Sequence, residues 1–173
     1  MRPDGLETSR LYLRQPRAAD FDDCLAMRSV PEVVRYIGNV AATSEDVWAR
    51  LLRYAGHWQW LGYGYWIVCT RDGDRFVGEV GLGEFRRGLG EDFDGRPEIG
   101  WVLAPWAQGL GFATEAARAA LDWSDARWPG AATVCLVSED NAASLGVAAK
   151  CGYVEMRRAA YKSSQAVLLS RAP

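Results

Sequence analysis

The chain has 173 residues, of which 49% are hydrophobic and 12% aromatic, with eight tryptophans. This is enough apolar material for a substantial core, and we expect one domain over residues 1–173. The formal net charge of -2 and the sequence pI of about 5.5 disfavour a protein that binds nucleic-acid backbones. No uninterrupted run of roughly 18 apolar residues predicts a membrane span. We therefore expect neither nucleic acid nor membrane as a partner.

Cysteine and histidine usage predicts no metal site and no disulfide framework. Cys24, Cys69, Cys135 and Cys151 are widely spaced without a CxxC pair, and His57 is the single histidine. Cysteines in such an arrangement are typical of buried, reduced thiols. The N-terminal segment MRPDGLETSR lacks the apolar core of a signal peptide, so we expect a soluble, cytoplasmic protein.

The beginning of the chain predicts one strand followed by helices. Apolar and polar residues alternate over residues 6–14, which indicates a strand that ends before Pro16. Asp20 is placed to cap a helix, and Pro31 interrupts or restarts that helix. This segment predicts a helical hairpin after the first strand.

A longer helix is expected next. Thr43 and Asp46 have the spacing of a capping box, and the apolar stripe that follows should reach about His57. His57 lies among aromatic residues and has no partner nearby in the sequence. It is therefore more typical of a packing residue than of a catalytic base.

Two strands joined by a tight hairpin follow this helix. Residues 63–70 and 75–85 are rich in β-forming side chains and flank an Asp-Gly turn. The loop at residues 86–96 is interpreted as a solvated surface loop in preference to a substrate-binding lid. Three glycines interrupt the second strand, a feature that often marks the close approach of a ligand: Gly78, Gly81 and Gly83.

The second half of the chain predicts alternating strands and helices. The alanine-rich helix after residue 111 should end at the Trp-Pro-Gly turn of residues 128–130, and Asn141 should cap the last helix. The expected elements are strands at 98–103 and 132–137, a helix at 142–151, and closing strands at 153–158 and 166–170.

Two glycines, Gly109 and Gly111, lie between the strand at 98–103 and the alanine-rich helix. The first turn of a helix has backbone N–H groups without partners and the positive end of the helix dipole, so it binds anions. The pattern predicts a phosphate-binding loop. A dinucleotide site is the main rival, but the second half of its G-x-G-x-x-G motif is missing.

These residues resemble a known family. The run QGLGFA at residues 108–113 resembles the Q/R-x-x-G-x-G/A signature of the GNAT superfamily of N-acetyltransferases. NAAS at 141–144 and KCGY at 150–153 are similar to the N-x-x-S…K-x-G-F/Y element of its RimJ/RimL-like branch, which acetylates ribosomal proteins. The opening LETSRLYLR also resembles that branch, so the resemblance covers nearly the whole chain.

The resemblance implies a GNAT-like α/β (α+β) fold with a mixed, mostly antiparallel sheet of about six to seven strands and helices on both faces. It also implies acetyl-CoA as cosubstrate, without a metal. The pyrophosphate would bind backbone N–H groups of the glycine loop, and the pantetheine arm would pair with the preceding strand. The implied cofactor-binding residues are Trp101, Val102, Leu103, Gln108, Gly109, Leu110, Gly111, Phe112, Ala113, Thr114, Asn141 and Ser144.

The implied chemistry is direct attack of a primary amine on a thioester. An α-amine with a pKa of about 8 loses its proton more readily than a lysine. Many relatives place a tyrosine seven residues after the position of Asn141 to protonate the leaving thiolate, but this chain has Ala148 there. The candidate acid is therefore Ser144, with an ordinary helix-start serine as the structural alternative.

Two glutamates, Glu98 and Glu79, are the candidate bases. Each is expected on a strand beside the cleft, and Glu98 resembles the glutamate that precedes I-G-W/Y in relatives. An ion pair with an arginine is an equally good interpretation of Glu98. A water chain would also suffice for an α-amine.

The prediction is an acetyl-CoA-dependent N-acetyltransferase that is a monomer or a homodimer. The leading acceptor is a protein N-terminal α-amine. A small-molecule amine, such as a polyamine, an antibiotic or an amino-acid analogue, is the first alternative. The second is a noncatalytic acyl-CoA-binding module, which the missing tyrosine favours.

Overall fold

The computed structural model of the protein describes residues 5–162 and 164–172, so residues 1–4, 163 and 173 of the expected single domain lie outside the described residues. Its strands form one eight-stranded sheet in the order β1-β2-β3-β4-β5-β6-β8-β7. All neighbouring strands pair antiparallel except β5 and β6, which pair in parallel. The predicted mixed, mostly antiparallel sheet is confirmed, with eight strands instead of six to seven.

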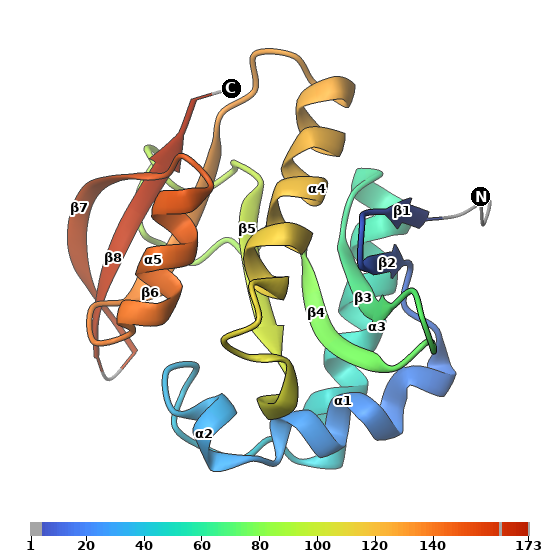
Figure 1. Cartoon of the computed structure of the whole chain (residues 1–173). Helices are drawn as coiled ribbons and strands as arrows, with labels where there is room; N and C mark the ends of the chain where they lie inside the picture. The colour runs from blue at the N-terminus through green and yellow to red at the C-terminus, as the bar shows by residue number, and fades with distance from the viewer. Residues whose placement is uncertain (1–4, 163, 173) are drawn as a thin grey trace.

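The elements follow one another along the chain as Figure 1 shows. The strands are β1 (Gly5–Glu7), β2 (Leu11–Arg14), β3 (Tyr65–Thr70), β4 (Phe76–Gly83), β5 (Glu98–Leu103), β6 (Thr133–Ser138), β7 (Val154–Tyr161) and β8 (Ser164–Arg171). The helices are η1 (Ala18–Asp20), α1 (Phe21–Arg28), α2 (Pro31–Val34), α3 (Ser44–Leu61), η2 (Pro105–Ala107), α4 (Phe112–Arg127) and α5 (Ala142–Lys150).

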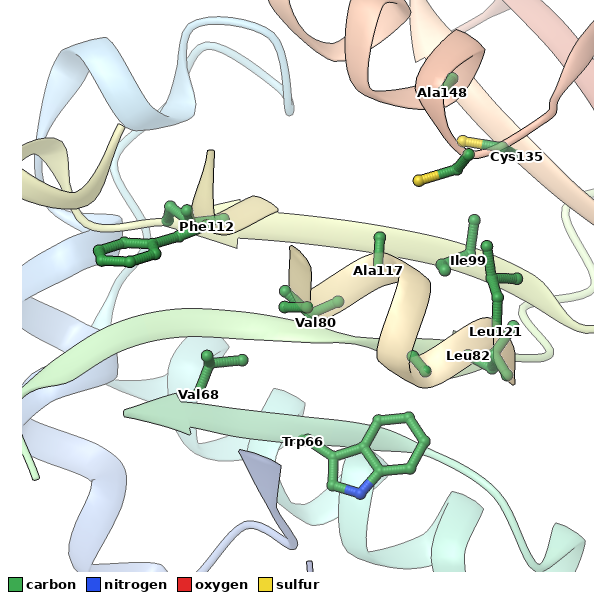
Figure 2. Close-up of a cluster of buried hydrophobic side chains, with 14 of the residues drawn as sticks. Trp66, Val68, Val80, Leu82, Ile99, Phe112, Ala117, Leu121, Cys135 and Ala148 are labelled. Atoms are coloured by element: carbon green, nitrogen blue, oxygen red, sulfur yellow. The ribbon is translucent and has the colours of Figure 1, made fainter. Parts of the chain in front are cut away.

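Helices cover both faces of the sheet (Figure 1). On one face, α1 and α3 pack on β3 through a cluster that includes Leu51, Tyr54 and Ile67. On the other face, α4 and α5 cover β4, β5 and β6, and Figure 2 shows Ala117 of α4 in the same apolar cluster as Val80 of β4. The small residues on the buried face of α4 let this helix lie close to the sheet.

The prediction of a single first strand over residues 6–14 is wrong. The structure has two strands, β1 and β2, joined by a turn at residues 8–10 and paired antiparallel. The Leu11 N–H donates to Thr8 Oγ1 at 2.9 Å, and the Thr8 N–H donates to the Leu11 carbonyl at 2.9 Å. Local alternation could not reveal this turn, because its side chains also bind Glu115 of α4, far along the chain.

The helix starts agree well with the sequence. Pro31 begins a separate short helix, α2, as its position predicted. Thr43 and Asp46 form the predicted capping box of α3, which continues past His57 to Leu61 and ends at Gly62 with φ of 74°. His57 is buried, with its ring centroid 5.5 Å from that of Phe85. The four cysteines are free and buried, as expected.

The loop at residues 86–96 is more firmly packed than a solvated surface loop. Phe93 is only 2% exposed and packs against Val134 of β6 and Leu168 of β8. The Asp94 carboxylate accepts backbone N–H bonds from three residues of the same loop, at distances of 2.6 to 3.0 Å. The loop is therefore a fixed cover on this part of the sheet.

None of the helices in the described part of the chain combines the length and the apolar character that a membrane span needs.

Candidate active site

The strands β5 and β6 pair at one end and then separate. Parallel pairing joins Glu98 to Val134 and Ile99 to Cys135, and it extends no further over the described residues. Beyond Ile99, β5 continues beside β4, while β6 continues beside β8. One edge of β5 over residues 100–103 is thereby left without a neighbouring strand.

Backbone alternation indicates which groups face this open edge. The Pro97 carbonyl accepts from the Val134 N–H at 3.0 Å, so it points toward β6. Because strand residues alternate in direction, the backbone groups of Trp101 and Leu103 point the same way. They are suited to bind an extended ligand as an added strand would bind.

The glycine loop lies directly after this open edge. Gly109 and Gly111 have φ of 74° and 81°, which only glycine adopts without strain. A Cβ built on Gly109 meets nothing within 4 Å, so the loop presents backbone to open space. Gly111 is the N-cap of α4 and provides no capping side chain, which leaves the first N–H groups of this helix available to an anion.

Contacts from the β1–β2 turn hold the start of α4 in place. Glu115 accepts from Thr8 Oγ1 at 2.5 Å and from Arg10 Nε at 2.7 Å, and Arg10 also donates to the Leu110 carbonyl at 3.0 Å. The Arg10 guanidinium lies 4.5 Å from the centroid of the Phe112 ring. These contacts neutralise the one carboxylate in the first turn of α4, so it does not repel an anion bound there.

A hydrogen bond joins β5 to the predicted motif at residues 141–144. Trp101 Nε1 of β5 donates to Ser144 Oγ of α5 at 3.2 Å. The Asn141 side chain caps α5 by accepting from the Ser144 N–H at 3.0 Å, as the sequence predicted. The Ser144 hydroxyl oxygen is therefore held from one side, while its proton is free to be donated elsewhere.

The remaining predicted cofactor-binding residues lie on or beside the loop. Gln108 donates its side-chain amide to the Leu103 carbonyl at 3.1 Å, which ties the loop to the end of β5. Val102 faces the opposite way from Trp101 and packs in a cluster with Met27 and Val33. Along the loop and the first turn of α4, Leu110 is half exposed, Phe112 is buried, and Ala113 and Thr114 are partly buried.

Glu79 lies in a buried ion pair. It is 0% exposed and accepts from Arg28 at 2.5 Å and from the Tyr54 hydroxyl at 2.9 Å. Burial alone would raise the pKa of this carboxyl, but the Arg28 guanidinium outweighs burial, and the pKa is lowered. Glu79 is thus held as a carboxylate away from solvent.

Glu98 lies where β5 and β6 begin to separate. Both of its oxygens accept from Arg87, at 2.7 and 2.8 Å, and Arg87 also donates to the Tyr161 hydroxyl at 2.5 Å. Burial raises the pKa of Glu98, although the bonds from Arg87 oppose that shift. The expected ion pair of Glu98 with an arginine is present.

Stacked tyrosines lie on the same face as both glutamates. The Tyr54 and Tyr65 rings stack with centroids 4.5 Å apart and an interplanar angle of 2°. A Cβ on Gly100 of β5 would lie 2.1 Å from the Tyr65 hydroxyl, so a glycine is required here for that hydroxyl to lie against β5. Sequence reasoning missed Tyr65, Arg28 and Arg87, because isolated tyrosines and arginines carry no motif and their partners are fixed only by the tertiary fold.

The structure thus brings most of the predicted residues together. The glycine loop, the end of β5 and Ser144 line one region, and Glu98 lies at its closed end. Glu79 lies on β4 opposite Val102 of β5, and its carboxylate is engaged in the ion pair with Arg28. Among the described residues, no group of histidine, cysteine and acidic side chains is arranged to hold a metal ion.

Comparisons of the sequence and of the structure with known proteins all identify acetyltransferases. The sequence profile of the acetyltransferase (GNAT) domain matches residues 10–154. The uncharacterized N-acetyltransferase YnaD of Bacillus subtilis is 30% identical over 118 residues, which make up 68% of this chain and 64% of that protein. A solved structure from Bordetella pertussis, assigned to the same family, is 31% identical with a TM-score of 0.88 over 98% of this chain and 99% of the other.

A more distant solved structure shares the fold alone. It is RimL, a ribosomal L7/L12 α-N-protein acetyltransferase in complex with coenzyme A, at 15% identity. The TM-score is 0.80, with 98% of each chain covered.

Proposed function

Because this chain belongs to the GNAT acetyltransferase family, we propose that it transfers an acetyl group from acetyl-CoA to a primary amine. The observation that carries the proposal is the separation of β5 from β6 directly beside the glycine loop. An open strand edge that ends at an uncapped helix start suits a ligand with an extended amide arm and a pyrophosphate at its end.

The backbone of the loop would hold the pyrophosphate. N–H groups from Gly109 to Ala113 are the donors we assign to it, and the open space beside Gly109 leaves room for the phosphates. The backbone groups of Trp101 and Leu103 would pair with the amides of the pantetheine arm. This arrangement requires neither a metal nor a lysine.

Ser144 is the residue that we assign as acid. When the amine nitrogen bonds to the acetyl carbon, the carbon–sulfur bond breaks and the thiolate takes a proton. The Ser144 hydroxyl accepts from Trp101, and this bond polarises its own O–H for donation to the sulfur. Ala148, buried in α5 at the usual tyrosine position, cannot take this role.

Replacing Ser144 should lower turnover much more than it weakens cofactor binding. We expect Ser144→Ala to lower kcat by about 100-fold, the usual contribution of a general acid, with little change in the Kd of acetyl-CoA. Trp101→Phe, which keeps the aromatic packing but removes the indole N–H, should lower kcat by a smaller factor. Thiol release measures kcat, and calorimetry measures Kd. Ser44→Ala, at the start of α3, is the control; wild-type kcat in Ser144→Ala would refute the assignment.

Glu98 is the carboxylate that we propose as base, acting directly or through one water. Each oxygen bound to Arg87 has a second lone pair for a water or an amine. The raised pKa of Glu98 makes it the better proton acceptor, whereas Glu79 is fully buried and held by two donors. We assign Glu79 mainly to holding Arg28 and Tyr54.

The pH profile tests this assignment. Glu98→Gln should lower kcat/KM near pH 6.5, and the defect should shrink above the amine pKa of about 8, where solution already supplies the neutral amine. The measurement is thiol release from pH 6 to 9 with a peptide α-amine. If Glu98→Gln matches the wild type throughout this range, Glu98 is excluded as the base.

A protein N-terminal α-amine is the acceptor class that we favour, because its low pKa suits a site with few proton acceptors. The fold shared with RimL supports this choice. A small-molecule amine is the alternative. The test is acetyl-CoA titration followed by thiol release over a panel of peptides, amino acids and polyamines. Tight binding without turnover on any amine would favour a noncatalytic acyl-CoA-binding module, and absence of binding would refute both proposals.

A further inference from the structure

The face of the sheet beneath α1 and α3 has more arginine than carboxylate. The two glutamates on this face are each engaged, Glu79 by Arg28 and Glu98 by Arg87. Two further arginines, Arg50 and Arg53, project from α3 one turn apart. Within residues 5–162 and 164–172, no carboxylate forms a salt bridge with either of them.

Arg50 has a buried donor with no partner. Its Nε is inaccessible to solvent and makes no hydrogen bond to the described residues. Asp46, one turn earlier on α3, is used by the capping box, where its carboxylate accepts from the Thr43 N–H at 2.9 Å and from Oγ1 at 2.7 Å. A buried guanidinium donor without an acceptor costs stability, so it requires an explanation.

The Phe85 ring lies beside two guanidiniums. The Arg53 guanidinium is 5.4 Å from the ring centroid and that of Arg87 is 4.6 Å from it. Burial, together with repulsion from Arg50 and Arg87, lowers the pKa of Arg53. Three positive groups are therefore crowded together, and among the residues that the structure describes only the Glu98 carboxylate forms a salt bridge with one of them.

This cluster lies next to the open edge of β5. Tyr54 follows Arg50 by one turn of α3 and stacks on Tyr65, whose hydroxyl lies against Gly100. Arg50 is close enough to favour the ionised forms of Tyr54, Tyr65 and Glu79. A molecule that reaches Gly100 from this face therefore passes the positive field of Arg50 and Arg53.

We infer that Arg50 and Arg53 bind a carboxylate of the acceptor, so that the acceptor is an amine that also carries a carboxylate. The inference rests on the proposed acetyl transfer and makes its acceptor class specific. Guanidinium donors bind carboxylates by charge-assisted hydrogen bonds, whereas they repel a polyamine. An acidic amino acid and a peptide N-terminus with an acidic side chain share this chemistry, and the probes below separate them.

The test compares acceptors that are matched in all but charge. The peptide amides Ala-Glu-Glu and Ala-Gln-Gln form one pair, and L-glutamate and L-glutamine amide form the other, with spermidine as the polyamine. Within the pair that is acetylated, we expect kcat/KM for the acidic acceptor to be at least about tenfold that for its neutral amide. Arg50→Met and Arg53→Met should each remove most of that preference while leaving the neutral acceptor nearly unchanged.

Stability and binding provide independent readouts. Arg50→Met should leave the Tm unchanged or raise it, because no described residue accepts a hydrogen bond from the buried Arg50 Nε; a structural role would lower it. Arg158→Met, on the edge strand β7 and half exposed, is the control for lost positive charge and should keep the acid preference. The inference would be overturned if the wild type had equal kcat/KM for the acid and its amide, or preferred spermidine. It would also be overturned if Arg50→Met lowered kcat/KM equally for both members of a pair.

Failure of acetyl transfer itself would be recognised separately. If no probe supports thiol release, the proposed function fails. Calorimetric titration of the CoA-loaded protein with N-acetyl-Ala-Glu-Glu amide and its Gln-Gln counterpart then decides the inference. Tighter binding of the acid that Arg50→Met abolishes supports a carboxylate site, and equal binding refutes it.

Discussion

Gly111→Val is expected to raise the Kd of acetyl-CoA by about 100-fold or more. Gly111 has φ of 81°, and a β-branched residue is strongly disfavoured there, at a cost of about 1–3 kcal/mol. The loop would relieve this strain by turning its N–H groups away from the phosphates. Hydrogen bonds to a charged group contribute about 1.5–3 kcal/mol each, so loss of two accounts for the effect.

Gly130→Val is the matched control for this variant. Gly130 has φ of 85° in the turn after α4, and a Cβ there meets nothing within 4 Å. It carries similar backbone strain at a distance from the proposed cofactor site. Calorimetric titration should give wild-type Kd for Gly130→Val, with a comparable loss of stability in both variants. Unchanged Kd in Gly111→Val would show that the pyrophosphate binds elsewhere.

Breaking the Arg28–Glu79 pair is expected to lower the free energy of unfolding by about 3–5 kcal/mol. Either Arg28→Met or Glu79→Gln leaves one charge uncompensated in a nearly dry environment. The double variant Arg28→Met/Glu79→Leu should lose much less than the sum of the single variants, since it leaves no buried charge. Chemical denaturation measures all three. Additive losses would mean that the two side chains act independently.

The pH dependence of this stability follows from the lowered pKa of Glu79. A lowered native pKa contributes stability that is present above the unfolded-state value of about 4.3 and is lost as pH falls through the native value. The difference between wild type and Glu79→Gln should therefore be constant near neutral pH. It should shrink as the pH falls below about 4.

Local signals in the sequence predicted the parts of this protein that depend on neighbouring residues. The helix start after Gly111, the Asn141 cap and the Thr43 capping box all depend on residues within a few positions of one another. Such contacts recur wherever the same short pattern occurs. The start of each of these helices could therefore be predicted correctly.

Contacts between distant segments could not be predicted in the same way. The turn at residues 8–10 splits the expected first strand, and its side chains bind Glu115, which lies 107 residues from Thr8. The count of eight strands follows in part from this split. The acid–base candidates show the same limit: Glu79 could be named from its strand, but its pairing with Arg28, 51 residues away, depends on how α1 packs on β4.

The acceptor side of the site depends still more on the tertiary fold. The Tyr65 hydroxyl reaches Gly100 of β5 only because residue 100 is a glycine, and Arg53 becomes a neighbour of Phe85 only when α3 packs on β3. None of these residues belongs to a motif. The contacts that would select an amine therefore became visible only in three dimensions.

A crystal structure with bound CoA is the most direct test of the proposed site. We expect the pyrophosphate on the N–H groups of residues 109–113, the pantetheine arm paired with Trp101 and Leu103, and the sulfur within hydrogen-bond distance of Ser144 Oγ. A CoA molecule bound away from the separation of β5 and β6, or with its sulfur remote from Ser144, would contradict the account.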